Sequence, residues 1–256
     1  MKVVIFAGGY GTRLSELTSI TPKPLIEIGD MPIIWHIMKI YSSYGYNDFI
    51  ICAGYKSHMI KKFFNELFYY SSDIEINLKN KSLKILKSQK EKWKITIVET
   101  GKETNTGGRL LRVKKYLRNQ KNFFLTYGDG LSNINLKEQY EFHKKNKKIV
   151  TLTAVNAPHR YGVVKLLKNQ VVKFDEKPDI KGATINGGFF IISNKIFNYI
   201  KGDNDIFEKN QLSQLAKLGQ LSAYTHTGFW HSMDTLRDKK NLDSLWISKK
   251  CPWKIW

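Results

Sequence analysis

Buried strands and amphipathic helices alternate along the first half of the chain. Residues 2–7 form a nearly continuous, β-branched apolar run, which is typical of a parallel strand covered on both faces. Pro32 precedes apolar positions with helical spacing, and Gly45 marks the expected end of that helix. Residues 48–53 predict a second buried strand, followed by a helix that Ser57 could cap. This rhythm indicates an α/β fold.

The segment 73–99 breaks the alternation. Apolar and polar residues alternate within it, which predicts strands and a hairpin that project from the core. The expected elements after it are a helix at 107–117, a strand at 122–126, a helix at 136–143, a strand at 149–155, a hairpin at 163–174, a strand at 185–193, helices at 195–201 and 205–218, a strand at 221–226 and a C-terminal helix at 234–247. We therefore expect one Rossmann-like α/β domain over residues 1–256. Its central sheet should be mostly parallel, with helices on both faces and antiparallel elaborations in the C-terminal half.

Positive charge is the unusual feature of the composition. Lys and Arg total 42 against 22 Asp and Glu, a formal charge of +20. Such an excess can serve nucleic acids, acidic membranes or anionic substrates. Only six of these residues are Arg, and the lysines are spread along the whole chain. We therefore favour a solvated basic surface over an interface for nucleic acid or membrane.

Cysteine content and hydropathy bear on location. The chain has two cysteines, and Cys52 lies in an apolar run typical of a buried core thiol. No run of 18 apolar residues predicts a membrane span. The apolar stretch at the N-terminus is too short for a signal peptide. The expected location is a reducing cytoplasm.

A glycine-rich turn follows the first strand. Ligands of open α/β sheets bind beyond the carboxyl ends of the strands, where Gly8, Gly9 and Gly11 stand. Without Cβ atoms, their N–H groups can form a nest for an anion. Leu14 occupies the place of the third glycine of a dinucleotide-binding fingerprint, and no P-loop motif follows. The glycines alone suit either a phosphate site or a tight turn.

Two basic residues favour the phosphate site. Arg13 follows the glycines directly, and Lys23 stands between Pro22 and Pro24. Prolines stiffen the backbone there and exclude a helix, so the ammonium group of Lys23 is presented at little entropic cost. A glycine nest with these two cations is a candidate site for a polyphosphate.

The stretch from Gly8 to Leu25 resembles the signature of the sugar-1-phosphate nucleotidylyltransferases. Further segments resemble one subfamily, the glucose-1-phosphate cytidylyltransferases, and these are residues 29–38, 106–110, 127–130, 185–190, 228–230 and 233–238. The resemblance implies a nucleotidyltransferase fold and transfer of a cytidylyl group from CTP to α-D-glucose 1-phosphate, with Mg²⁺ as cofactor. It also implies a homo-hexamer, in which the segment 73–99 is our candidate for part of the contact. The CDP-glucose would supply CDP-linked deoxysugars of bacterial surface polysaccharides such as lipopolysaccharide O-antigen.

The resemblance also implies roles for individual residues. Arg13 and Lys23 would be catalytic. The nucleotide would contact Phe6, Ala7, Gly8, Gly9, Tyr10, Gly11, Thr12, Arg13, Lys23, Thr104, Arg109 and Gly128. The sugar phosphate would contact Glu176, Lys177, Asn186 and Gly187. Mg²⁺ would be held by Asp129 and Asp234.

The two aspartates also have plain structural explanations. Asp129 lies in a Gly-Asp-Gly sequence after a predicted strand, which suits a turn as well as a metal ligand. Asp234 precedes a predicted helix, where an N-cap is the ordinary role of such a residue. The resemblance favours the metal for both.

Base choice depends on the loop around Thr104 and Arg109. Arg109 has only donors, which suit the N3 and O2 acceptors of cytosine, and a hydroxyl or backbone carbonyl would take the amino group. An enzyme of the same fold that uses UTP or dTTP remains an alternative. A nucleic-acid-binding protein would need clustered Arg and exposed aromatic residues. A catalytically silent relative would be expected to lack Arg13, Lys23 or the acidic residues, and all are present.

Overall fold

β1 (Val3–Ala7) lies inside a nine-stranded sheet, between β4 (Asp48–Ala53) and β8 (Asn122–Tyr127), and pairs with both in parallel. β7 (Lys94–Glu99) extends this parallel half beyond β4. All five residues of β1 are buried, alternately in two apolar clusters on opposite faces of the sheet. The apolar run at 2–7 therefore reflects cover on both faces, as predicted.

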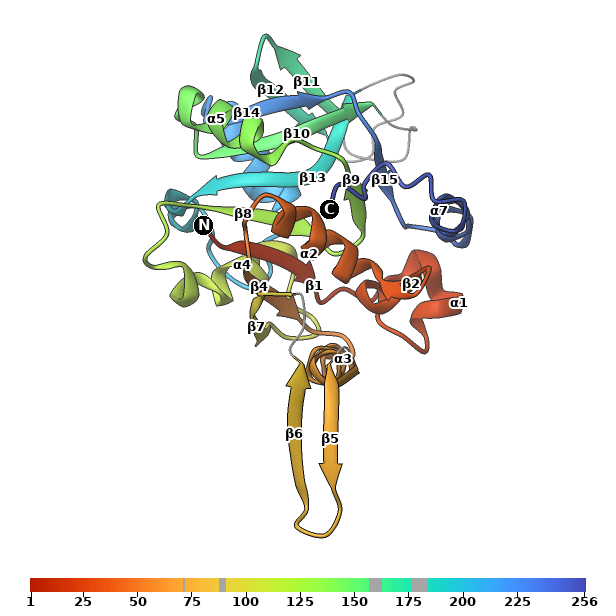
Figure 1. Ribbon diagram of the computed structural model, residues 1–256. Coiled ribbons are helices and arrows are strands. Elements are labelled where there is room, and N and C mark those ends of the chain that lie inside the picture. Colours follow the sequence, from red (N-terminus) through yellow and green to blue (C-terminus); the bar gives the residue numbers. More distant parts are fainter. Residues whose placement is uncertain (71, 88–90, 157–162, 176–183) are drawn as a thin grey trace.

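The computed structural model describes residues 1–70, 72–87, 91–156, 163–175 and 184–256 (Figure 1). In the second half of the sheet, β13 (Thr184–Ser193) runs antiparallel to β8 and joins the two halves. The remaining strands there are β10 (Val150–Asn156), β11 (Val163–Leu167), β12 (Gln170–Asp175) and β14 (Leu221–His226). β10 and β14 pair in parallel, and β11 and β12 form an antiparallel hairpin. The predicted α/β class, with a parallel core and antiparallel elaborations, is confirmed.

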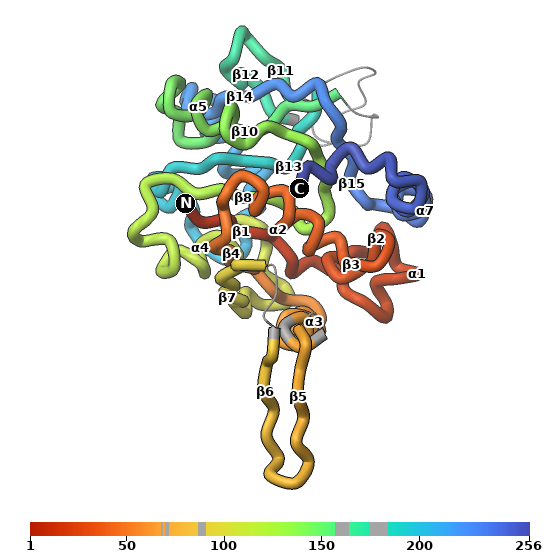
Figure 2. The backbone as a smooth tube through the Cα atoms, viewed as in Figure 1, coloured from red at the N-terminus to blue at the C-terminus, as the bar shows by residue number. Residues whose placement is uncertain are grey.

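Helices cover both faces of the sheet, which the backbone trace in Figure 2 shows as layers. One face carries α2 (Ile33–Ser43), α3 (Ser57–Tyr70), α5 (Leu136–Asn146) and α7 (Leu236–Ile247). The other carries α4 (Thr106–Arg112), α6 (Ser213–Lys217) and the 3₁₀ turns η3 (Lys114–Leu117) and η4 (Asn194–Asn198). The end of the chain packs against α2: the ring centroids of Trp256 and of Trp35, which lies in α2, are 5.8 Å apart.

Local structure differs from the sequence prediction at two helices. Ser57 does not precede α3 as a cap but is its first residue, and its hydroxyl donates to Glu99 Oε1 at 2.7 Å. The helix expected over 205–218 begins as a π-helical turn, η5 (Glu208–Leu212), before α6. A long-range partner decides the first case, because Glu99 is the last residue of the distant strand β7.

The segment 73–99 is divided between two environments. β5 (Asp73–Asn77) and β6 (Ser82–Lys87) form a hairpin that extends away from the body of the molecule (Figure 1). β7 instead pairs with β4 in the central sheet, and its Ile95 and Ile97 pack against the core. Only the β5–β6 hairpin therefore projects from this segment, since β7 packs its apolar side chains against the core.

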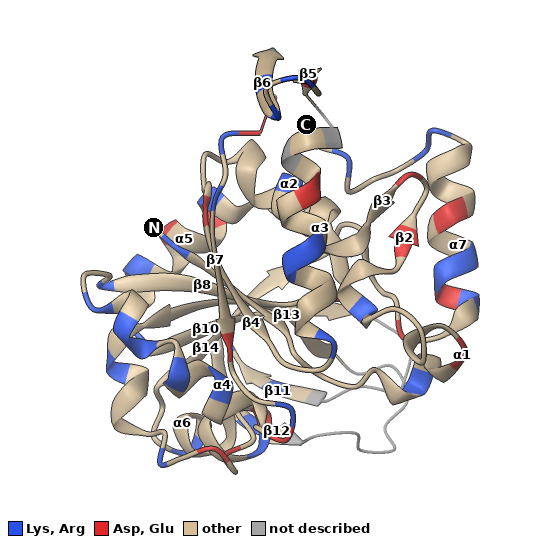
Figure 3. Ribbon diagram, turned by 90° about the horizontal axis from the view of Figure 1, so that it is seen from below, with Lys and Arg blue, Asp and Glu red and all other residues tan. Residues whose placement is uncertain are grey.

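Charge and burial follow the expectations for a basic α/β protein. Lys and Arg occur on many helices, strands and loops rather than on a single element (Figure 3). Cys52 is free and buried, and burial raises the pKa of its thiol to about 12. Among the described residues, no helix combines the length and apolar character that crossing a bilayer requires.

Candidate active site

The glycine-rich turn leaves β1 at its carboxyl end and leads into η1 (Thr12–Leu14) and α1 (Ser15–Thr18). Gly11 adopts a φ of 68°, in the left-handed region that favours glycine. A Cβ atom at Gly8 would lie 2.1 Å from Arg109 Nη1, so a side chain does not fit there. Gly9 is exposed, which leaves its backbone open to a ligand, whereas Gly8 is buried beside Arg109.

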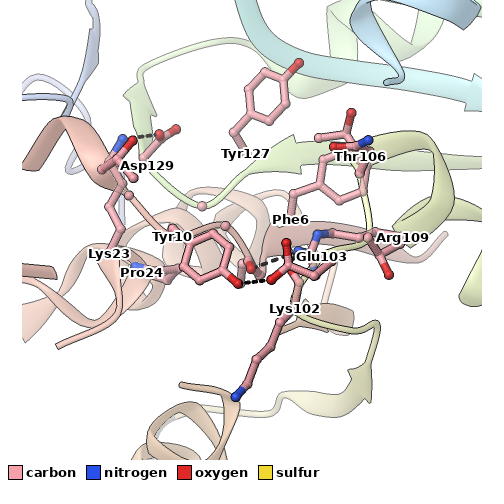
Figure 4. Close-up of a pocket in the computed structure, with 18 of the residues that line it drawn as sticks. Phe6, Tyr10, Lys23, Pro24, Lys102, Glu103, Thr106, Arg109, Tyr127 and Asp129 are labelled. Atoms are coloured by element: carbon pink, nitrogen blue, oxygen red, sulfur yellow. Dashed lines mark hydrogen bonds and ion pairs between the residues drawn. The ribbon is translucent and has the colours of Figure 1, made fainter. Parts of the chain in front are cut away.

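A cavity of about 470 Å³ opens beside this turn (Figure 4). It lies where β1 and β8 end, as expected for a ligand site in a parallel sheet. Its size falls in the range of small-molecule pockets, roughly 300–1,000 Å³. The structure brings all the predicted nucleotide-binding residues into its wall, namely Phe6, Ala7, Gly8, Gly9, Tyr10, Gly11, Thr12, Arg13, Lys23, Thr104, Arg109 and Gly128.

Lys23 joins the two predicted metal ligands. Its Nζ lies 2.5 Å from Asp129 Oδ2 and 2.8 Å from Asp234 Oδ1, and Arg13 Nη2 lies 2.9 Å from the same Asp234 oxygen. Lys23 begins the 3₁₀ turn η2 (Lys23–Leu25), after Pro22 in an extended conformation. The proline-rich segment therefore holds the lysine backbone in a fixed turn, as expected.

The electrostatics of this cluster follow from burial and pairing. Burial alone would raise the pKa of Asp234, but the neighbouring Lys23 and Arg13 outweigh it and lower that pKa to about 2. Burial opposes the charged form of Lys23, and the two carboxylates still raise its pKa. Lys23 and Asp234 are therefore both charged at neutral pH.

Asp234 is not the cap of α7. Thr235 is the N-cap residue, and it forms a capping box with Asp238. Asp234 instead accepts a hydrogen bond from Ser232 Oγ at 2.9 Å and directs its other oxygen to Lys23 and Arg13. The helix-cap explanation of Asp234 is therefore wrong.

The two aspartates fit a divalent cation. Asp129 and Asp234 come from distant parts of the chain and direct oxygens at one position, where the ammonium of Lys23 stands in for a cation. Within the described ranges, no three His, Cys, Asp or Glu side chains come together as a metal-binding group. Two carboxylates suit Mg²⁺, which takes its other ligands from water and substrate phosphates.

A second cavity, of about 230 Å³, adjoins the first and shares Arg13 and Asp129 with it. The predicted sugar-binding residues Asn186 and Gly187 of β13 line this cavity. Asn186 Oδ1 accepts a hydrogen bond from the N–H of Gly188, which has a φ of 76°. The other predicted sugar-phosphate residues, Glu176 and Lys177, lie outside the described residues.

The sequence analysis assigned no site role to three residues of the second cavity: Tyr127 and Trp230, which lie in segments that carry the resemblance, and Glu208, which lies in none of them. Glu208 Oε1 accepts from the hydroxyl of Tyr127 at 2.5 Å, and Oε2 accepts from the hydroxyl of Thr106 at 2.7 Å. Trp230, in β15 (Trp230–Ser232), donates to the carbonyl of Gly187 at 2.7 Å. Glu208 opens the π-helical turn η5, a feature frequent at functional sites. No local pattern marks this residue, because its partners are about a hundred positions away.

Arg109 is bound within the protein. One terminal nitrogen donates to Thr100 Oγ1 and to the carbonyl of Gly101, at 2.8 and 2.7 Å. The other donates to the carbonyls of Gly8 and Lys102, at 2.9 and 3.1 Å. The side chain thus ties the glycine turn to the loop after β7. Its terminal N–H groups already have acceptors within the protein, and direct contact between Arg109 and the base stays a prediction.

Known proteins are similar to this sequence along its full length. The nucleotidyl transferase family matches residues 2–235. A glucose-1-phosphate cytidylyltransferase of Salmonella typhimurium is 46% identical, and a probable glucose-1-phosphate cytidylyltransferase of Bacillus subtilis is 41% identical. Each match covers 100% of both chains.

Solved structures show the same fold. The crystal structure of HddC from Yersinia pseudotuberculosis has a TM-score of 0.75 at 21% identity, covering 96% of this chain and 99% of that one. A UDP-glucose pyrophosphorylase complexed with UDP-glucose also has a TM-score of 0.75, at 19% identity, with 97% and 98% of the two chains covered. With the family match and the full-length relatives, these similarities establish that the chain belongs to the nucleotidyl transferase family.

Proposed function

We propose that this protein transfers the cytidylyl group of CTP to α-D-glucose 1-phosphate, giving CDP-glucose and pyrophosphate. The observation that carries the proposal is the full-length match, at 46% identity, to a relative named for this reaction. The site geometry supports it, because two adjoining cavities share Arg13 and Asp129. Two phosphate-bearing substrates can meet at this boundary. CDP-glucose for the deoxysugars of surface polysaccharides is part of the same proposal.

The reaction joins a sugar phosphate oxygen to the α-phosphorus of CTP, while the bond to pyrophosphate breaks. Catalysis of this kind depends on positioning and charge neutralisation. The open backbone of residues 9–11 would bind phosphate oxygens, with Arg13 and Lys23 neutralising their charge. Asp129 and Asp234 would hold Mg²⁺, which when bound supplies further charge neutralisation and orients the triphosphate.

The direct test of the proposed reaction measures pyrophosphate release. Purified protein is incubated with Mg²⁺, glucose 1-phosphate and CTP, UTP or dTTP in turn. Release with CTP and glucose 1-phosphate together, but with neither alone, supports the proposal. Equal rates with CTP and UTP would refute the cytidylyl assignment and keep the nucleotidyl transferase one.

Base selection should depend on the loop that Arg109 supports. Thr104, which is buried, and its loop neighbours line the nucleotide cavity. A backbone carbonyl accepts from the amino group of cytosine but faces the carbonyl of uracil unfavourably. An unpaired buried group costs about 1–3 kcal/mol. We expect CTP to be preferred over UTP at least tenfold in kcat/KM, about 1.4 kcal/mol.

Replacing Arg109 by alanine should reduce this preference while leaving measurable pyrophosphate release. The expected cause is loss of four hydrogen bonds that hold the loop and the glycine turn. Steady-state kcat/KM for both nucleotides measures the change. Arg112→Ala is the matched control, because Arg112 is exposed and pairs with Asp203 outside the cavity. If Arg109→Ala keeps the CTP preference of the unmodified protein, the hydrogen bonds from Arg109 to this loop do not contribute to base selection.

A homo-hexamer in the cytoplasm completes the proposal. The β5–β6 hairpin leaves apolar side chains exposed, namely Ile74, Ile76, Leu78, Leu83 and Leu86. A two-stranded hairpin is at best marginally stable by itself, so a partner surface is expected to cover it. Both cysteines of the chain are free, which suits a reducing compartment.

Charging the apolar face of the hairpin should lower the oligomeric state. Ile76 lies opposite Leu83, and Ile76→Lys places a charge among these apolar residues. Light scattering coupled to size exclusion measures the mass of the assembly. Glu75→Lys, on the neighbouring residue of the same strand, is the control and should keep the mass of the unmodified protein. A monomeric unmodified protein would overturn the hexamer.

A further inference from the structure

The position between Asp129 and Asp234 holds an ammonium group in the free protein. Lys23 Nζ approaches one oxygen of each carboxylate, at 2.5 and 2.8 Å (Figure 4 shows its pairing with Asp129). The side chains of Lys23 and Asp234 are 12% and 2% exposed. Water therefore screens these interactions poorly, and the ammonium is strongly held.

A divalent cation on the same oxygens conflicts with this arrangement. Mg²⁺ binds carboxylate oxygens at about 2.0–2.1 Å, which would bring it within a few ångströms of the ammonium. Like charges at that separation and degree of burial repel strongly. Metal binding therefore requires the side chain of Lys23 to turn away from the carboxylates. The ammonium group then loses two ion pairs, and other anionic oxygens are needed to compensate its charge.

The nucleotide cavity is the nearest place for those oxygens. Lys23 lines it beside the glycine turn, and its Cβ lies 3.3 Å from the position that a Cβ at Gly11 would take. The backbone of Lys23 is fixed between Pro22 and Pro24 in η2. Rotation of side-chain torsions is thus enough to move the ammonium from the carboxylates toward a phosphate group.

We infer that Lys23 is a built-in competitor of the metal, so that a divalent cation binds tightly only when a polyphosphate draws the lysine away. The inference rests on the proposed function, in that Asp129 and Asp234 are taken as the metal ligands. Binding of metal and of nucleotide must then favour each other by the same factor, because such coupling is reciprocal. Removing the charge of Lys23 should remove the competition.

Binding of Mn²⁺, followed by its electron paramagnetic resonance, tests this coupling in the intact protein. The dissociation constant is measured with and without an α,β-methylene analogue of CTP, corrected for the Mn²⁺–nucleotide complex in solution. We expect the nucleotide to tighten Mn²⁺ binding to the unmodified protein at least tenfold. In Lys23→Gln without nucleotide, Mn²⁺ should bind at least tenfold more tightly than to the unmodified protein, with coupling reduced toward one.

Lys102→Gln is the matched control. It removes the same charge from the wall of the same cavity, but Lys102 does not pair with either aspartate in the described contacts. It should leave the Mn²⁺ affinity of the nucleotide-free protein within twofold. Lys23→Met provides a second uncharged variant if Lys23→Gln does not fold, which thermal unfolding followed by circular dichroism checks.

Two results overturn the inference. One is Mn²⁺ affinity in the Lys23 variants that is no tighter than in the unmodified protein. The other is nucleotide-independent Mn²⁺ binding in the unmodified protein. The same measurements are repeated with the α,β-methylene analogue of UTP. Both overturning results can therefore be recognised whichever base the protein prefers. Coupling with both analogues but no pyrophosphate release from CTP and glucose 1-phosphate would instead reject the proposed function and keep the role of Lys23.

Discussion

Lys23→Ala is expected to keep the fold and lose most of the activity, about 2–4 kcal/mol of transition-state stabilisation. The side chain of Lys23 pairs with Asp129 and Asp234. Its backbone carbonyl accepts from the N–H of Ile26 in the proline-flanked turn, a hydrogen bond that the substitution leaves in place. The absence of the Lys23 ammonium group removes one of the cations that we propose neutralise the developing charge on the phosphates. The loss should occur in kcat/KM for CTP, measured by pyrophosphate release at saturating Mg²⁺.

The control for this prediction is Lys61→Ala, which removes a surface lysine of α3 paired with Glu99. It should retain normal turnover, since it lies outside both cavities. Circular dichroism and the melting temperature establish that each variant is folded. Near-normal turnover in a folded Lys23→Ala protein would remove this residue from the mechanism. Tighter metal binding together with lost turnover would fit both roles assigned to it.

Replacing Asp129 or Asp234 by asparagine should weaken activation by Mg²⁺. The change keeps the size of the side chain and removes one of the two negative charges that face the cation position. We expect the Mg²⁺ concentration for half-maximal activity to rise at least tenfold, with partial recovery of turnover at high Mg²⁺. A titration of pyrophosphate release against Mg²⁺ measures both effects.

The two variants are each other's comparison. Asp234 is 2% exposed and Asp129 is 24% exposed, so Asp234→Asn removes the more deeply buried of the two carboxylates that compensate the charge of Lys23, whose own side chain is 12% exposed. It should lower the melting temperature more than Asp129→Asn does. If Asp234→Asn lowers the melting temperature alone and leaves Mg²⁺ activation unchanged, its role is structural.

Local sequence determined the parallel core and the glycine-rich turn. The apolar run at 2–7 requires cover on both faces, and the structure places apolar clusters on both sides of β1. Gly11 adopts a left-handed conformation, which glycine takes readily because it has no Cβ atom. The prolines around Lys23 hold it in a short fixed turn. Each of these properties depends on residues a few positions apart, which is why the sequence reveals them.

Tertiary structure alone decided what the site residues contact. Lys23 and Asp234 are separated by 211 positions, and no spacing rule relates them. The same holds for Glu208, which meets Tyr127 across 81 positions, and for Arg109, whose donors are bound by the glycine turn 101 positions away. Thr235, rather than Asp234, caps α7. The physical reason is that the turns after β1 and β8 meet only when these strands pair in the sheet. The charged side chains then form ion pairs and hydrogen bonds with the residues that the folded backbone brings close to them.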